Sequence, residues 1–207
     1  KKMKLVKHGE SWKCQCDICM SLKIDPQLIT NYNRNKYQKE SFLLYCIVAA
    51  GKTAKVQASK LNGFLEGITR PFNYIKELAE GKQLYNYLVK SKLGQYKRIE
   101  ESFKKVVDLD LDCVSVDELV RVKGIGPKTA RFFVMHSRKN ERVATLDVHI
   151  LKWLREQGVE NVPSQTPQNS LTYNRLEKAF LELAEKMGRT PAELDLQIWR
   201  EKSQKVA

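Results

Sequence analysis

Residues 122–130 read VKGIGPKTA, and this stretch decides the fold that we expect. Gly124 and Gly126 stand one residue apart between two short segments of helical character. Glycine adopts backbone conformations that other residues avoid, and it lets the backbone come close to a ligand. Pro127 suits the first position of a new helix. The stretch therefore predicts a helix-hairpin-helix, in which two short helices flank a tight glycine turn.

This hairpin predicts DNA binding. Its second helix would begin with amide groups that point at the turn, and such a helix start binds phosphate without a side chain. The apolar Ile125 can anchor the turn to a core, and the hairpin can grip the DNA backbone without reading sequence. An ordinary αα-hairpin with a glycine turn is the alternative. The hairpin residues that we expect to bind DNA are Lys123, Gly124, Ile125, Gly126 and Thr129.

Helix signals continue on both sides of the hairpin. Ser115 and Glu118 form a capping box, which starts a helix that runs to about Val122. The apolar run 42–50 (FLLYCIVAA) predicts a central buried helix that Gly51 ends. No series of strands is apparent, so the predicted class is all-α. Further helices are predicted over 54–68, 127–137, 148–157, 173–187 and 191–202, and shorter helical pieces across 71–90 and 95–106. We expect a polar segment over 1–36 and helical domains over 37–207.

Composition favours a polyanionic partner. The chain has 37 basic and 24 acidic side chains, which gives a formal net charge of +13. Such an excess indicates nucleic acid first and an anionic membrane second, and a merely soluble basic protein is the alternative. No apolar run reaches the ~18 residues of a membrane span, and the basic start leads into no signal segment. We therefore expect an intracellular protein, in the cytoplasm and nucleoid or in the nucleus, that is not secreted and binds no membrane.

Lys128 and Asp147 are the candidate catalytic residues. Lys128 lies just inside the second hairpin helix, where the helix dipole disfavours the charged form of its amine. A neutral amine is a nucleophile that can form a Schiff base, although a phosphate-binding lysine fits the spacing equally well. Asp147 is placed to cap the next helix. A carboxylate held ionised at that point could also stabilise positive charge that develops on a sugar.

The hairpin stretch followed by LDVHI at 146–150 resembles the HhH-GPD superfamily of DNA glycosylases. The resemblance covers roughly 37–203 and implies a two-lobed helical fold with the active site between the lobes. It places the lysine of the members with lyase activity on Lys128 and the family aspartate on Asp147. The stretch 42–53 resembles the first core helix and the loop that enters DNA, which implies DNA contacts at Gly51 and Lys52.

The C-terminal third is similar to the short archaeal and bacterial type of 8-oxoguanine DNA glycosylase, on residues 143–163 and 173–199. This resemblance implies base-excision repair by a monomer that binds double-stranded DNA containing a damaged base. The enzyme would flip out an oxidised base, 8-oxoguanine above all, excise it through a Schiff base on Lys128, and nick the strand as an AP lyase. No cofactor is required.

Two further residues are site candidates. The resemblance puts Trp199 at the damaged-base pocket, where it could stack on the flipped base, whereas the residues alone favour a core position. His149 could contact a DNA phosphate or Asp147, and a packed or surface histidine is an equal alternative. His136 is interpreted as structural.

The sequence also departs from its relatives. That type often carries a C-terminal lysine whose carboxylate helps to read the lesion, whereas the sequence ends Lys-Val-Ala. The region 50–52 lacks the Gln or Asn that commonly fills the gap left by the flipped base. No cysteine follows Cys113, so the iron–sulfur loop of endonuclease III relatives is absent. The alternatives are an endonuclease III-like enzyme for oxidised pyrimidines and a non-catalytic helix-hairpin-helix protein that binds DNA.

A cysteine cluster lies near the start of the chain. Cys14, Cys16 and Cys19, with His8 upstream, could supply three thiolates and an imidazole to a small structural zinc site. Structural zinc sites usually use two spaced ligand pairs, and the fourth ligand here is a guess. Ordinary reduced thiols are the alternative.

Overall fold

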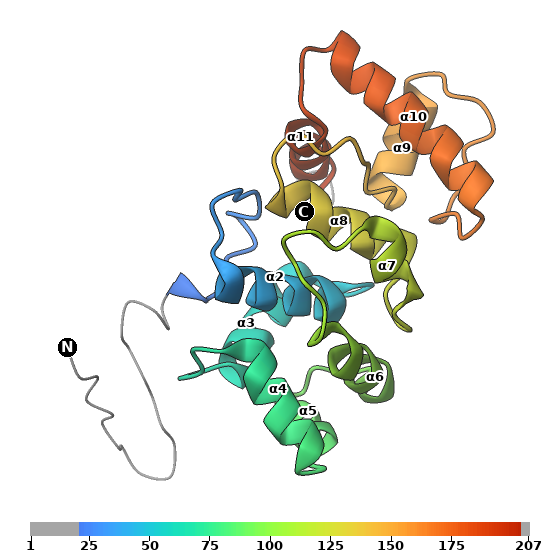
Figure 1. Cartoon of the computed structure of the whole chain (residues 1–207). Helices are drawn as coiled ribbons and strands as arrows, with labels where there is room; N and C mark the ends of the chain where they lie inside the picture. Colours follow the sequence, from blue (N-terminus) through green and yellow to red (C-terminus); the bar gives the residue numbers. More distant parts are fainter. Residues whose placement is uncertain (1–20, 204–207) are drawn as a thin grey trace. The chain divides into compact units, whose positions relative to one another are not determined.

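The computed structural model describes residues 21–203, and all regular secondary structure within that range is helical (Figure 1). The predicted all-α class is therefore confirmed. The chain divides into two compact units. The first unit comprises residues 21–29 and 33–125, and the second comprises residues 30–32 and 126–203. The expected boundary at residue 36 and the position of the active site relative to the lobes stay predictions.

Short helices build the first unit. They are α2 (Lys36–Ala49), α3 (Ala54–Phe64), α4 (Pro71–Glu80), α5 (Leu84–Lys90), α6 (Tyr96–Val106) and α7 (Val116–Arg121). One predicted helix proves shorter than expected, whereas the shorter pieces predicted across 71–90 are present. The helix predicted to reach Ile68 ends at Phe64, because Gly67 has a φ of +78° and the Ile68 amide closes a turn on Leu65. The stretch 71–90 forms two helices, because Lys82 between them has a φ of +54°.

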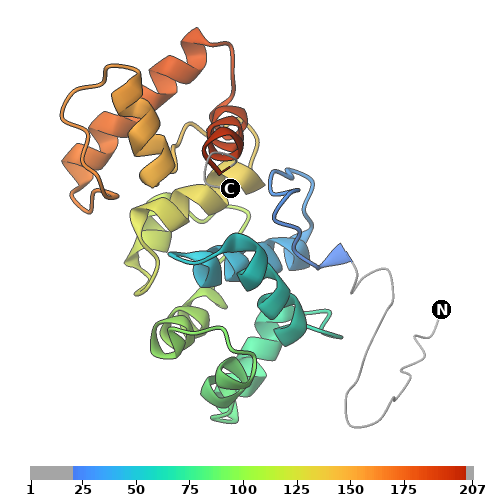
Figure 2. The same cartoon turned by 180° about the vertical axis from the view of Figure 1, so that it is seen from behind.

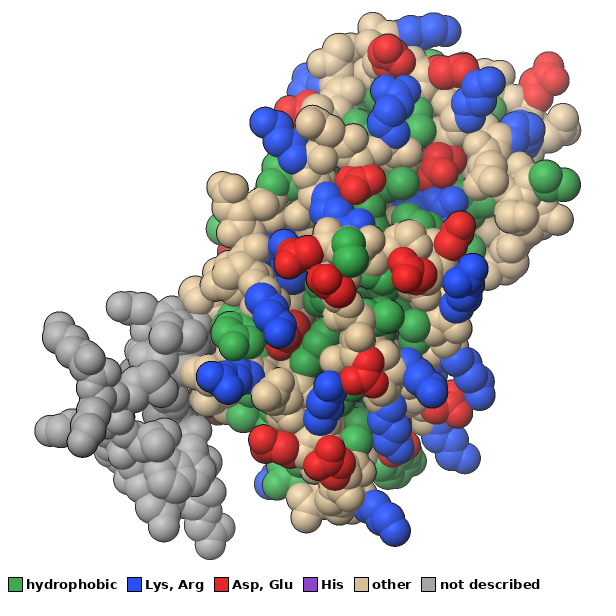
Figure 3. Space-filling view, in the orientation of Figure 1, with side chains coloured by type: hydrophobic (Ala, Val, Ile, Leu, Met, Phe, Trp, Pro, Cys, Tyr) green, Lys and Arg blue, Asp and Glu red, His purple; other side chains and the backbone are tan. Residues whose placement is uncertain are grey.

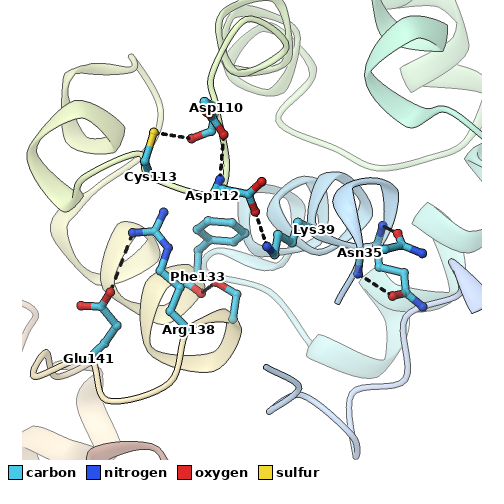
Figure 4. A network of polar contacts seen from close by, with 10 residues as sticks. Asn35, Lys39, Asp110, Asp112, Cys113, Phe133, Arg138 and Glu141 are labelled. Carbon is cyan, nitrogen blue, oxygen red and sulfur yellow. Dashed lines mark hydrogen bonds and ion pairs between the residues drawn. The ribbon is translucent and has the colours of Figure 1, made fainter. Parts of the chain in front are cut away.

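Helix α2 begins at a capping box that the sequence analysis did not find. The Asn35 side chain accepts a hydrogen bond from the Gln38 amide, and the Gln38 side chain accepts one from the Asn35 amide, each over 2.9 Å (Figure 4). One turn later, Lys39 donates to Asp112 in the segment before α7 (Figure 4). These bonds fix the start of α2 and join it to the segment that leads into the hairpin.

The middle of α2 is the centre of the first unit. Residues 40–48 are all buried, as the all-round apolar pattern predicted, and α3, α4 and α6 pack around the helix. The buried Glu40 carboxylate accepts the Phe72 amide at 3.0 Å, which satisfies a donor in the first turn of α4. The helix ends at Ala49, and Gly51 follows with a φ of +71°. The predicted buried helix is thus confirmed.

Four helices build the second unit: α8 (Pro127–Ser137), α9 (Val148–Glu156), α10 (Ser170–Lys186) and α11 (Pro191–Ser203) (Figure 2). Helix α11 packs against the other three. A capping box starts α11, because Thr190 and Glu193 each accept the amide of the other. The core side chains come mainly from α9 and α10 and include Ile150, Leu151, Leu154, Tyr173, Leu176, Phe180, Leu194 and Ile198.

Helix α10 holds the connector between α8 and α9. The Tyr173 hydroxyl donates to the Ala144 carbonyl at 2.8 Å and accepts the Leu146 amide at 3.1 Å. Glu177, one turn later, accepts the Ala144 amide at 2.8 Å and lies 2.7 Å from the Arg131 guanidinium of α8. These contacts satisfy the buried amide and carbonyl of Ala144 and the buried amide of Leu146. They also fix the point at which α9 begins.

The surface carries charge of both signs. On the face drawn in Figure 3, Lys and Arg side chains lie interspersed with Asp and Glu side chains, so the net charge of +13 is not gathered into one patch there. Among residues 21–203, no helix combines the length and the apolar character that a membrane crossing demands.

We expect Tyr173→Phe to lower the free energy of unfolding by about 1–3 kcal/mol, because it leaves a buried amide and a buried carbonyl without their partner. Tyr85→Phe is the matched control, since Tyr85 is 38% exposed. Urea unfolding of both variants checks this. Equal stability of the two variants would show that the Tyr173 hydroxyl does not hold the connector.

Candidate active site

The first half of the hairpin folds tightly against α6. Gly124 has a φ of +93°, and a Cβ atom at this position would lie 2.3 Å from the Ser102 hydroxyl. The turn therefore requires glycine here, both for its backbone conformation and for space. Ile125 is 3% exposed and its amide bonds the Val122 carbonyl at 3.0 Å, so Ile125 anchors the turn to the core as predicted.

Arg98 and Ser102 of α6 hold this half of the hairpin in place. The Arg98 guanidinium donates to the Gly124 carbonyl and to the Ile47 carbonyl, each over 2.9 Å. The Ser102 hydroxyl lies 2.8 Å from the Lys123 carbonyl. One arginine thus joins the hairpin to the end of the central helix α2. The sequence alone indicated this role for neither side chain, because both contacts join residues that lie more than 20 positions apart.

The second half of the hairpin starts α8. Gly126 has an ordinary φ of −88°, and among the described residues no atom lies within 4 Å of a Cβ placed there. The packing of the protein does not require glycine at this position, and an open face suits close approach of a ligand. Gly126 offers no side chain to cap the α8 amides. Thr129 is buried, so we expect it to meet DNA only through its amide.

Lys128 and Asp147 both belong to the second unit. Lys128 lies half-buried in the first turn of α8. Asp147 is the N-cap of α9, as predicted, and its Oδ1 atom accepts the amides of His149 and Ile150, each over 2.9 Å. Because two amides hold it, the carboxylate keeps a fixed orientation. One side chain thus starts the helix and presents a negative charge.

Asp195 is a buried acidic residue of the second unit for which the sequence alone indicated no role. It lies on α11, is 6% exposed, and its Oδ2 atom is 3.3 Å from Nε2 of the buried His136. Burial raises the pKa of the Asp195 carboxyl, the His136 hydrogen bond opposes this, Asp147 raises the pKa further, and Lys128 lowers it. The two carboxyl groups and the Lys128 amine therefore interact electrostatically. The sequence of α11 contains no motif that sets Asp195 apart from its other polar residues.

Trp199 is 41% exposed, so the expectation of a core position is wrong. It follows Asp195 by one helical turn, which places both residues on the same face of α11. An aromatic side chain is thus exposed on the side of the helix that carries Asp195. His149 is half-buried, beside Asp147 in the first turn of α9.

The region predicted to enter DNA lies in the first unit. Gly51 is exposed, and Lys52 donates to the Leu93 carbonyl at 2.5 Å. Burial lowers the pKa of the Lys52 amine, and the positive charges of Arg98 and Lys60 lower it further. The Lys52 ammonium is therefore held against this unit, and a role in filling a gap in DNA stays a prediction.

Among residues 21–203, no group of three His, Cys, Asp or Glu side chains could hold a metal ion. Cys14, Cys16, Cys19 and His8, the candidate zinc ligands, lie outside the described residues. The zinc site therefore stays a prediction from the sequence.

Comparison with known proteins places this hairpin and its flanking helices in a family. The family model described as 8-oxoguanine DNA glycosylase matches residues 26–189. The chain belongs to the 8-oxoguanine DNA glycosylase family. It is 30% identical over 187 residues to the 8-oxoguanine DNA glycosylase/AP lyase of Methanocaldococcus jannaschii, with 84% of this chain and 85% of that protein covered. It is also 30% identical over 173 residues to the enzyme of the same name from Thermoplasma volcanium, covering 80% of each.

Solved structures agree on the family's fold. The crystal structure of the Methanocaldococcus jannaschii 8-oxoguanine glycosylase/lyase in complex with DNA containing 8-oxoguanine superposes with a TM-score of 0.64. The superposition covers 92% of this chain and 91% of that one, at 23% identity. A second crystal structure of the Methanocaldococcus jannaschii 8-oxoguanine DNA glycosylase gives a TM-score of 0.61. The predicted glycosylase fold is therefore confirmed.

We expect the two hairpin glycines to differ when each is changed to alanine. Gly124→Ala should lower the free energy of unfolding by about 1–3 kcal/mol, because it combines a left-handed backbone with a steric clash. Gly126→Ala should change it by less than about 1 kcal/mol, because its φ suits alanine. Urea unfolding measures both, and equal losses would contradict the difference in packing.

Proposed function

We propose that this chain is a base-excision DNA glycosylase with AP lyase activity, that it acts as a monomer, and that its substrate is 8-oxoguanine in double-stranded DNA. The observation that carries the proposal is a lysine in the first turn of the hairpin helix and a helix-capping aspartate in the same unit. Membership of the family adds weight, because the relatives are named 8-oxoguanine DNA glycosylase/AP lyase.

The hairpin would hold the DNA backbone. The start of α8 has no side-chain cap, so its amides can bind a phosphate that approaches over Gly126. Lys123 adds an exposed positive charge beside the turn. Gly51 and Lys52 would contact the strand where the damaged base leaves the stack, and His149 would contact a phosphate nearby. These contacts carry no sequence information, which suits an enzyme that searches for damage.

The damaged base must leave the helix before its sugar bond can be reached. Trp199 offers an exposed aromatic ring on which a flipped base can stack. Base–aromatic stacking contributes about 1–3 kcal/mol and favours no particular base. Trp199 would therefore supply affinity for the flipped base, whereas hydrogen-bonding groups would have to select the oxidised one.

The chemistry would use Lys128 as the nucleophile. Its neutral amine attacks the anomeric carbon of the sugar, a C–N bond forms, and the base leaves with the electron pair of the glycosidic bond. Asp147 stabilises the positive charge that develops on the sugar. The sugar then opens to a Schiff base, which allows β-elimination of the 3′ phosphate and nicks the strand. No step needs a cofactor, and the reaction takes place inside the cell, where genomic DNA lies.

Borohydride trapping tests the nucleophile. We expect wild-type protein to form a covalent adduct with duplexes that contain 8-oxoguanine or an abasic site, because borohydride reduces the Schiff base. Lys128→Gln should form none and still bind DNA. Lys152→Gln, which removes an exposed lysine of α9, should trap like wild type. An undiminished adduct in Lys128→Gln would overturn the assignment. Stronger trapping on a duplex that contains thymine glycol would overturn the assignment of 8-oxoguanine as the substrate.

Asp147→Asn separates capping from catalysis. Asparagine keeps the cap, because its side-chain oxygen still accepts the amides of α9, but it removes the negative charge. We expect unchanged thermal unfolding and a base-release rate that falls by about 10²–10³-fold in single-turnover assays. Full activity in this variant would leave Asp147 with the capping role alone.

A further inference from the structure

Acidic side chains are missing from two stretches of the first unit. Residues 41–65 contain three lysines, and residues 81–99 contain four lysines and one arginine, but neither stretch contains an Asp or a Glu. Every Asp and Glu among residues 21–125 lies outside them. The two stretches hold most of α2, all of α3 and α5, and the start of α6. The positive charge of this unit is therefore concentrated in a few neighbouring elements.

Contacts at one backbone carbonyl bring the two stretches together in space. Lys52, from the first stretch, donates to the Leu93 carbonyl of the second at 2.5 Å. The buried Gln57 side chain of α3 donates to the same carbonyl at 3.1 Å. The lysines around this junction form a basic surface, which we define as Lys52, Lys55, Lys60, Lys90, Lys92 and Lys97.

The lysines of the basic surface have no acidic partners. Among residues 21–203, no carboxylate forms an ion pair with any of them, and the ion pairs of the first unit use Lys39, Lys76, Lys104 and Lys123 instead. Burial lowers the pKa of the Lys52 amine, and the charges of Arg98 and Lys60 lower it further. Like charges gathered in this way repel one another and destabilise the compact state. A bound polyanion would remove that cost.

The turn before α6 holds part of this surface in a fixed shape. Lys92, Gly94 and Gln95 have φ angles of +53°, +71° and +48°. A left-handed backbone costs about 1 kcal/mol or more at a non-glycine residue, so it persists only where other contacts hold it. The two bonds to the Leu93 carbonyl do so, as does the bond of 2.7 Å from Nε of Arg98 to the Gln95 side chain. The cations of this turn therefore lose little backbone freedom when they bind a ligand.

The phosphate backbone of DNA is the polyanion that fits this surface. Lys52 belongs both to the basic surface and to the segment that we expect to contact DNA. Lysine is a point charge on a flexible stem, which suits a phosphate and reads no base. The exposed Tyr85 ring lies 6.0 Å from the Tyr96 ring between these lysines, and aromatic rings among cations are typical of nucleic-acid surfaces.

We propose that the basic surface binds the phosphate backbone of duplex DNA away from the damaged nucleotide, and that it supplies affinity that does not depend on the lesion. The proposal rests on the proposed function for the choice of DNA as partner. It adds cations of α3, α5 and α6 to the contacts of the hairpin. Such contacts let a protein slide along undamaged DNA, which suits a search for rare lesions.

The test measures binding to an undamaged duplex of about 20 base pairs, by fluorescence anisotropy over a series of salt concentrations. Lys55→Gln/Lys92→Gln removes one exposed cation from each stretch. Each lost phosphate contact should lower the slope of log affinity against log salt by about 0.9, so the slope should fall by about 2. Affinity at about 0.1 M salt should fall roughly tenfold or more.

Lys36→Gln/Lys105→Gln is the matched control, because it removes two exposed lysines of the same unit that lie outside the basic surface. We expect this variant to keep the salt slope of wild type. An equal loss of slope in the two double variants would overturn the proposal, because net charge alone would then explain the binding.

An anionic lipid surface is the competing partner. Vesicles of phosphatidylserine and phosphatidylcholine test it by co-sedimentation. The proposal predicts that Lys55→Gln/Lys92→Gln loses affinity for the duplex. A variant that loses binding to the vesicles but keeps the salt slope of wild type on the duplex would overturn the proposal.

This proposal and the proposed function fail in different ways. If wild type forms an adduct that depends on Lys128, and Lys55→Gln/Lys92→Gln keeps the salt slope of wild type, only the role of the basic surface fails. If wild type forms no adduct on any duplex but loses salt slope in this variant, the proposed chemistry fails and the basic surface stands.

Discussion

The hydroxyl of Tyr173 bonds a carbonyl and an amide of the same connector, two residues apart, and Glu177 bonds the amide of the first. These contacts come from one face of α10 and act on the chain just before α9. Because Asp147 is the first residue after this connector, the contacts from α10 hold the backbone just before Asp147, and the α9 amides orient its carboxylate. Arg131, which lies one turn after Lys128 on α8, pairs with Glu177. Helix α10 therefore contacts both α8, which carries Lys128, and the connector that leads to Asp147.

Asp147 shows how one side chain can meet a structural and a chemical demand with the same bonds. The two amides that it accepts start α9, and they also hold a negative charge in one orientation. Asp195 is held by different means, through burial and a contact with an imidazole. One carboxyl group is thus placed at a helix end and the other in the interior of the same unit. Two carboxyl groups of one unit thus stand in unlike environments, one held by amides and one by an imidazole.

The sequence predicted the features that depend on neighbouring residues. The capping box of α7, the proline start of α8 and the Asp147 cap all follow from spacings of a few residues, although the equally local capping box of α2 was missed. The contact between His136 and Asp195 spans 59 positions, and that between Thr30 and His136 spans 106, so no local pattern could reveal them. For Trp199 the residues alone favoured a core position that its 41% exposure contradicts, because the sequence does not show which face of α11 is covered.

Peptide mapping of the borohydride-reduced adduct tests the central claim that Lys128 is the nucleophile. Trypsin cuts after Lys123 and after Lys128 in the unmodified chain, whereas a modified Lys128 resists cleavage. The account predicts that the mass of the trapped sugar remnant appears on the peptide spanning 124–131, which is then cleaved only at its ends. A remnant on any other lysine, with the 124–128 peptide released unmodified, would contradict it.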